Sequence, residues 1–167
     1  MEITLEQLLA GRDNRAEHQR TLMAAWPGSA LVCLTVQLPG PVKRNHESLV
    51  IGGAGLAALL DRFGSVLSHA QVRDLETGYE AFLVVPLPLK MVKRICCDIE
   101  NTHPLGRLMD IDVIGPEGPL DRSEVGETPR KCLLCQQEAR FCMRTQAHSR
   151  EQLMARIREM VADFENR

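Results

Sequence analysis

Two aspartates in a short apolar run are the residues of this chain whose spacing points most directly to chemistry. Asp110 and Asp112 alternate with apolar residues in the run MDIDV. If this run is a strand, its alternate side chains share a face, so the two carboxylates project together. Adjacent carboxylates repel each other, and a hard cation such as Mg²⁺, which also binds substrate phosphates, relieves that repulsion. The pattern predicts a magnesium site at Asp110 and Asp112; the alternative is an exposed strand face that carries two aspartates.

The turn before these aspartates holds two further candidates, in the sequence HPLGR. Arg107 follows a glycine at the entrance of the expected strand, where a basic side chain is well placed to contact a bound phosphate. His103 is a candidate general base because imidazole exchanges protons near neutral pH. A histidine before a proline is also a common turn residue, and that interpretation stays open.

Several basic residues form a second candidate group. Arg12 and Arg15 are three residues apart on an expected helix, Lys43 follows the turn LPGP, and Arg130 precedes the cysteine-rich region. Arginine forks suit the oxygens of a polyphosphate. For any one of these residues the alternative is a solvated charged position.

A cysteine-rich motif in the last third of the chain invites a zinc interpretation. Cys132, Cys135, Cys142 and His148 have ligand-like identities. If residues 128–145 form one helix, however, Cys135 and Cys142 are separated by about 10 Å of axial rise. Sulfur atoms on one zinc ion lie within roughly 4 Å of each other. A shared zinc ion is therefore not favoured, and the motif is interpreted as small core residues on a helix.

Composition limits the function classes. The chain has 167 residues, 44% hydrophobic and 25% charged, with a net charge of −2. This length fits a single domain over residues 1–167. A nucleic-acid-binding surface would normally show a basic excess, and aromatic residues for base stacking are only 4%. No apolar run approaches the roughly 20 residues that span a bilayer, and no basic leader is present, so we expect a cytoplasmic protein.

Periodicity and capping signals indicate an α+β domain, with a small mixed or antiparallel sheet packed with helices. Thr4 with Gln7 and Ser149 with Gln152 have the form of capping boxes. Helices are expected over residues 5–25, 54–63, 89–101 and 128–145, with one more after 149. Strands are expected over 30–38, 66–75, 79–85 and 107–114, with a short extended piece at 50–51. The strand over 30–38 is expected to be central.

Four stretches in consistent order resemble the apo-citrate lyase phosphoribosyl-dephospho-CoA transferase family. They are GRDNRAEHQ (11–19), LPGPVK (38–43), HPLGRLMDIDV (103–113) and RKCLLC…A..C.R…HS (130–149). The resemblance implies transfer of the prosthetic group of 2′-(5″-triphosphoribosyl)-3′-dephospho-CoA to a serine of the acyl-carrier subunit of citrate lyase. A phosphodiester forms and pyrophosphate leaves.

The resemblance also gives the candidate residues roles. Asp110 and Asp112 would hold Mg²⁺ on the triphosphate, while Arg107, Arg12, Arg15 and Lys43 would contact its phosphates. The alternation of aspartate and apolar residues is that of polymerase-β-type nucleotidyltransferases, so a nucleotidyltransferase-like fold is one form this domain could take. The Gly-Ser pair that those enzymes place ahead of the aspartates is absent here, because the window reads CDIEN. The alternative function is a zinc-stabilised protein-binding module built on Cys132, Cys135, Cys142 and His148.

Overall fold

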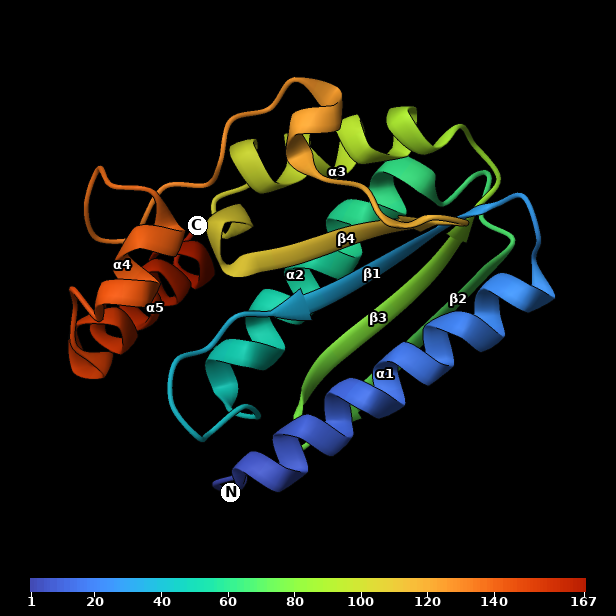
Figure 1. The fold of residues 1–167 in the computed structure, drawn as a ribbon. Coiled ribbons are helices and arrows are strands. Elements are labelled where there is room, and N and C mark those ends of the chain that lie inside the picture. Colours follow the sequence, from blue (N-terminus) through green and yellow to red (C-terminus); the bar gives the residue numbers. More distant parts are fainter.

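A five-stranded antiparallel sheet forms the centre of the computed structural model, which describes residues 1–167 (Figure 1). Its strand order is β2-β3-β1-β4-β5, and each neighbouring pair is antiparallel. The strands are β1 (Ala30–Val36), β2 (His69–Leu75), β3 (Gly78–Val85), β4 (Met109–Gly115) and β5 (Gly118–Pro119). The predicted α+β class and the central position of the first strand are confirmed, and β2 and β3 form a hairpin.

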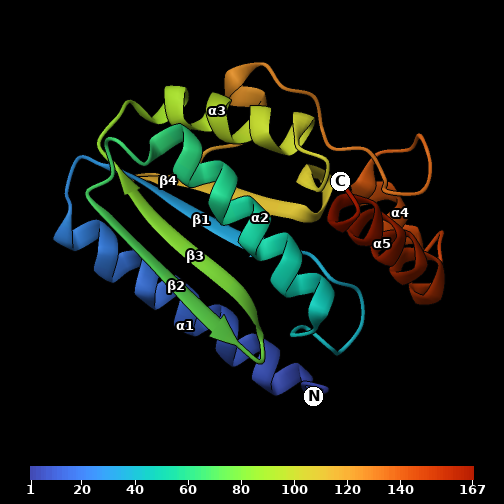
Figure 2. The same ribbon diagram turned by 180° about the vertical axis from the view of Figure 1, so that it is seen from behind.

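Helices cover the two faces of the sheet unequally. They are α1 (Leu5–Ala25), α2 (His46–Phe63), α3 (Leu89–Thr102), α4 (Ala139–Thr145) and α5 (Arg150–Glu165), with short 3₁₀ turns η1 (Gly106–Leu108) and η2 (Arg122–Val125). One face is covered by α2 and α3, and the opposite face by α1 alone (Figures 1 and 2). None of these helices is both long enough and apolar enough to cross a membrane.

Each face of the sheet has its own apolar core. The larger core includes Leu34, Leu83 and Ile111 together with buried residues of α2, α3 and α5. The smaller core lies under α1 and includes Leu31 and Phe82. Since α1 runs along the β2 and β3 side of this face and also packs against β1, the part of the face formed by β4 is the one with no helix in front of it (Figure 1). That uncovered part is where the polar residues of β4 project.

The extended piece expected at residues 50–51 is wrong, because α2 begins at His46 and contains both residues. Asn45 caps the helix, and Ser48 completes the capping box. Glycines weaken a helix on their own, but here they allow close packing. A Cβ at Gly52 would lie 2.5 Å from the Tyr79 ring, so only glycine lets α2 approach β3 this closely.

The long helix expected over residues 128–145 is also wrong. Only α4, which begins at Ala139, is helical, and the residues before it form a tight loop. In this loop the Cys132 N–H donates to the Gln137 carbonyl at 2.7 Å, and the backbones of Lys131 and Glu138 pair in an isolated antiparallel β-bridge. The Thr-Pro pair at 128–129 resembles a helix start, but these tertiary contacts override it. Arg107 similarly lies in η1 rather than on the strand, so strand alternation does not decide where its side chain points.

Candidate active site

The two aspartates of β4 share one face of the sheet, as predicted. Asp110 and Asp112 are half-buried, whereas the alternating residues Met109, Ile111 and Val113 are buried on the other face. Their neighbours across the strand pair are Thr35 and Cys33 of β1. The carboxylates therefore lie on the α1 side of the sheet, over its uncovered part.

The surroundings of Asp112 oppose its negative charge. Burial raises the pKa of Asp112 to about 6, with a further contribution from the negative charge of Asp110, while the positive charge of Lys93 acts in the opposite direction. Asp110 accepts a hydrogen bond from Gln37 Nε2 at 2.8 Å. Hard carboxylate oxygens that repel each other in this way fit a divalent cation such as Mg²⁺.

Two adjoining cavities open beside the aspartates. The first, which we call the α1 cavity, has a volume of about 550 Å³ and includes Arg12 and Arg15 of α1 in its lining. The second, the α3 cavity, has a volume of about 420 Å³ and includes Lys93 of α3 and Asp112. Both are within the size range of ligand sites. The residues that line both cavities are Gln37, Arg107, Asp110 and Met143.

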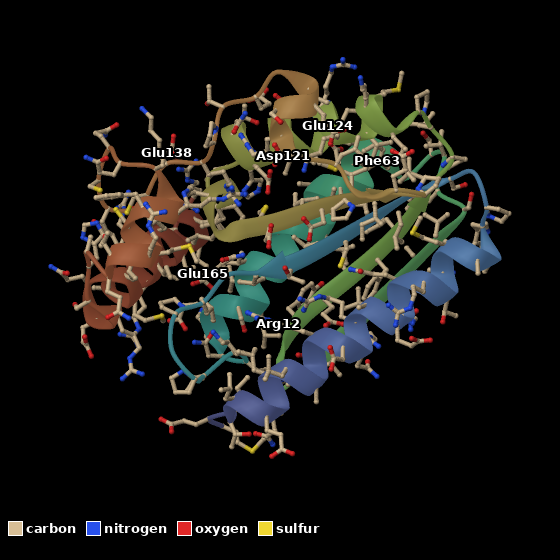
Figure 3. The ribbon with its side chains drawn as sticks, in the orientation of Figure 1. Arg12, Phe63, Asp121, Glu124, Glu138 and Glu165 are labelled. Carbon is tan, nitrogen blue, oxygen red and sulfur yellow. The ribbon has the colours of Figure 1, made fainter.

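Four of the predicted basic residues meet in the α1 cavity beside Asp110: Arg12, Arg15, Lys43 and Arg107. Arg12 lies on the side of α1 that faces the strands and makes no ion pair (Figure 3). Arg15 lies 3.4 Å from the buried carboxylate of Glu80. The Lys43 Nζ donates to the Leu38 carbonyl at 2.5 Å, and burial, then the charge of Arg12, lowers the Lys43 pKa. The chain thus gathers positive charge from segments that are far apart in sequence.

Arg107 is the basic residue best placed between the two cavities. Its Nε donates to the Lys131 carbonyl at 2.7 Å, and its two terminal nitrogens make no hydrogen bond within the protein. Burial, and next the charge of Arg130, lowers the pKa of its guanidinium. A partly desolvated guanidinium with free donors is suited to bind an anionic oxygen.

Arg130 has a structural position instead. It makes four hydrogen bonds, to the carbonyls of Gly106, Arg107 and Met109 and to the carboxylate of Glu100. Because these bonds occupy both terminal nitrogens, Arg130 has little left to offer a phosphate. Glu100 also accepts from the Ile111 N–H at 3.1 Å and pairs with Arg122 at 2.9 Å. Glu100 and Arg130 together support the free edge of β4 beside the aspartates.

His103 is not brought together with the other candidates. Its Nδ1 accepts a hydrogen bond from the Leu105 N–H at 2.9 Å, and its ring lies against Phe164. It is not among the residues that line either cavity. The structure favours the turn interpretation of His103 over a role as general base.

Sequence reasoning did not single out Gln37, Lys93 or Glu100 as strong site residues. Lys93 is buried, yet it lines the α3 cavity close enough to influence Asp112. Its neighbours in sequence include Lys90 and Arg94, and nothing in the pattern separates a cavity lysine from solvated ones. The one usable signal is amphipathic spacing in α3, which puts Lys93 and Glu100 seven residues apart on one side of the helix.

The cysteine motif departs from its predicted geometry. One donor atom from each of Cys132, Cys135, Cys142 and His148 lies within 4.8 Å of the others. A shared metal was not favoured because residues 128–145 were expected to form one helix, and that helix is not present. These residues are therefore close enough to coordinate one ion.

Fold and site define a single-domain α+β protein in which carboxylates and guanidinium groups line adjoining polar cavities. The chain belongs to the apo-citrate lyase phosphoribosyl-dephospho-CoA transferase family, whose family model matches residues 3–164. It is 37% identical to a probable apo-citrate lyase phosphoribosyl-dephospho-CoA transferase of Vibrio cholerae, over 98% of this chain and 94% of the relative. An Escherichia coli protein of the same name, without "probable", is 34% identical over 98% and 91%. A probable transferase of Streptococcus pyogenes is 32% identical over 99% and 88%.

Proposed function

We propose that the chain transfers the phosphoribosyl-dephospho-CoA group of 2′-(5″-triphosphoribosyl)-3′-dephospho-CoA to a serine of the citrate lyase acyl-carrier subunit. The observation that carries this proposal is the placement of Asp110 beside four basic side chains in the α1 cavity, with Asp112 lining the adjoining α3 cavity. Family membership supports the choice of donor and acceptor. No nucleic acid and no membrane takes part in the proposed reaction.

The reaction is a displacement at phosphorus. The serine oxygen forms a bond to the phosphorus next to the ribose, and the bond from that phosphorus to the bridging oxygen breaks. Pyrophosphate leaves with the electron pair of that bond, and the hydroxyl proton passes to a carboxylate or to water in the open cavity. This makes the enzyme a nucleotidyltransferase-type transferase. The nucleophile comes from the carrier protein, so this chain needs none.

Asp110 and Asp112 are the residues that would hold a magnesium ion. Bound there, the ion would neutralise negative charge on the triphosphate as the leaving group departs. Gln37 fixes one oxygen of Asp110, so the carboxylate is oriented before any ligand arrives. Lys93 lines the α3 cavity together with Asp112 and would add its positive charge to that of the ion.

The basic residues of the α1 cavity would bind the anionic oxygens of the donor. Arg107, whose terminal nitrogens are free, is the best placed for the departing diphosphate, and Arg12 lies across the same cavity. Arg15 and Lys43 add positive charge there. Arg130 is not included among these phosphate contacts, because its terminal N–H groups donate to Glu100 and to backbone carbonyls at the start of β4.

Asparagine substitutions at the aspartate pair test the proposal. Asp110→Asn and Asp112→Asn keep side-chain size but remove the charge, so we expect the fold to persist and carrier modification to fall by at least about a hundredfold. The measurement is the mass of purified carrier subunit after incubation with the triphosphate donor and Mg²⁺. Asp163→Asn, an exposed residue of α5, is the matched control and should retain full activity. Full modification of the carrier by either β4 variant would refute the proposed role.

A further inference from the structure

Four ligand-type residues converge in the segment of residues 128–148, which we call the cysteine segment. The donor atoms of Cys132, Cys135, Cys142 and His148 all lie within 4.8 Å of one another, and the sulfur atoms of Cys135 and Cys142 are 3.4 Å apart. Tetrahedral zinc with bonds near 2.3 Å to sulfur holds its ligands at spacings of about 4 Å. We propose that this cluster is a structural zinc site with three cysteines and one histidine.

The histidine provides an independent observation. Among buried side-chain nitrogen and oxygen atoms of the whole chain, His148 Nε2 is the one that has no hydrogen-bond partner. Buried polar atoms in folded proteins are almost always paired, so an orphan of this kind needs an explanation. A zinc ion bonded to that nitrogen would supply the missing partner.

The backbone of the segment is arranged around the cluster. The Leu134 N–H donates to the Cys132 sulfur at 3.4 Å, the type of contact that supports a ligating thiolate. At the other end, Gln146 adopts a left-handed conformation with φ of 50°, the single non-glycine residue in the chain with positive φ. This turn brings His148 back to Cys142. A strained backbone persists where its surroundings require it.

Apolar packing does not account for the stability of the cysteine segment. Cys142 is the single buried residue between Thr128 and Ser149, and the large side chains Phe141 and Met143 are exposed. A segment that buries so little apolar surface needs another source of stability, and a metal ion bound by deprotonated cysteines is one. Three sulfur ligands with one imidazole favour zinc over magnesium or calcium, and four protein ligands close the site to water or substrate.

The position of the segment gives the zinc ion a consequence beyond local stability. Leu133 lines the α1 cavity, Met143 lines both cavities, and the Lys131 carbonyl receives the hydrogen bond of Arg107. Zinc would therefore fix one wall of the cavities and the position of Arg107. Only this consequence rests on the proposed function; the zinc site itself is independent of it. A zinc ion at this position would stabilise the fold of this domain. This role differs from the protein-binding module that was considered from the sequence.

Metal analysis of the full chain tests the site directly. Protein purified under reducing conditions without chelators should contain one zinc ion per chain by elemental mass spectrometry. Cys135→Ser should lose the zinc, whereas Cys97→Ala removes a thiol of α3 outside the cluster and should keep it. Replacement of zinc by Co²⁺ should give the absorption bands of cobalt bound by thiolate in tetrahedral geometry. These readouts do not depend on activity.

Hydrogen exchange is a second test of the zinc site. Chelation should accelerate exchange of backbone amides in residues 131–148 by at least about tenfold and leave the central sheet unchanged. The proposal would be overturned if zinc-free protein exchanged the amides of residues 131–148 as slowly as zinc-bound protein does. It would also be overturned by zinc retained by Cys135→Ser, or by a native chain that is two hydrogens lighter because Cys135 and Cys142 form a disulfide.

Discussion

The carboxyl group of Asp112 lies in surroundings that oppose its negative charge. Burial, then Asp110, raises its pKa to about 6, although Lys93 acts in the opposite direction. A cation between the two aspartates would favour the ionised form of Asp112. Metal binding and proton release are therefore coupled at this residue, and the affinity for Mg²⁺ should decrease as the pH falls below about 6.

This coupling predicts a pH dependence of folding stability. The folded protein holds the Asp112 proton more tightly than the unfolded chain, so without metal this residue lowers the free energy of unfolding as pH rises from about 4 to about 6. Asp112→Asn cannot ionise and should be more stable than the parent by about 1–3 kcal/mol at pH 7, but not at pH 4. Urea unfolding at both pH values in chelator-free, metal-free buffer measures the difference. Asp163→Asn should show no such trend, and an equal effect of Asp112→Asn at both pH values would contradict the raised pKa.

At the scale of elements, β4 depends on side chains where a neighbouring strand is absent. Its pairing with β5 covers only its last two residues, Ile114 and Gly115. Earlier along the same edge, Arg130 donates to the Met109 carbonyl and Glu100 accepts from the Ile111 N–H. This buried ion pair therefore replaces ladder hydrogen bonds on the strand that carries the aspartates.

Arg130→Met tests this role. The change leaves the Glu100 carboxylate buried with one arginine partner fewer and three carbonyls without their donor, so we expect a loss of about 2–4 kcal/mol in the free energy of unfolding. Arg156→Met breaks an exposed pair with Glu159 and should cost less than about 0.5 kcal/mol. Urea titrations of both variants give the comparison. Unchanged stability with lost carrier modification would instead favour the phosphate-binding role first predicted for Arg130.

The sequence predicted elements where local signals and tertiary packing agree. The capping boxes at Thr4 and Ser149 each begin a helix, and the alternation around Asp110 forms a strand. The start of α2 was missed because its box uses Ser48 in place of glutamate or glutamine, and because its glycines are explained only by contact with β3. Residues 128–145 were mispredicted for the converse reason, since long-range contacts override a plausible local cap.

At the scale of the whole molecule, the candidate site is assembled from nearly the full length of the chain. Arg12 comes from the first helix, the aspartates from β4 and Met143 from the short helix α4. Residue types and spacing identified the aspartates and the cations that line the α1 cavity, but they gave no signal for Gln37 and did not separate Lys93 from the other candidate lysines. Those two residues join the candidate site only because the end of β1 and helix α3 border β4, and one sequence does not reveal that arrangement.

The shared cavity predicts that an inorganic polyphosphate binds without the rest of the donor. Tripolyphosphate with Mg²⁺ should raise the melting temperature of the protein by a few degrees, less so at high salt, because charge attraction drives binding. Arg107→Gln should abolish most of this shift, since its free guanidinium faces both cavities. Arg156→Gln, on the exposed side of α5, should leave it intact. Equal shifts for the two variants in thermal unfolding would exclude Arg107 as a phosphate contact.

The ion pair at the edge of β4 has one more consequence. An uncovered strand edge offers a template on which strands of other molecules can add, the first step toward aggregation. Along β4 that template is occupied by Arg130 and Glu100, whose charged side chains cannot propagate a ladder into a further strand. The interaction that supports the proposed catalytic strand thereby also keeps identical copies from stacking onto it.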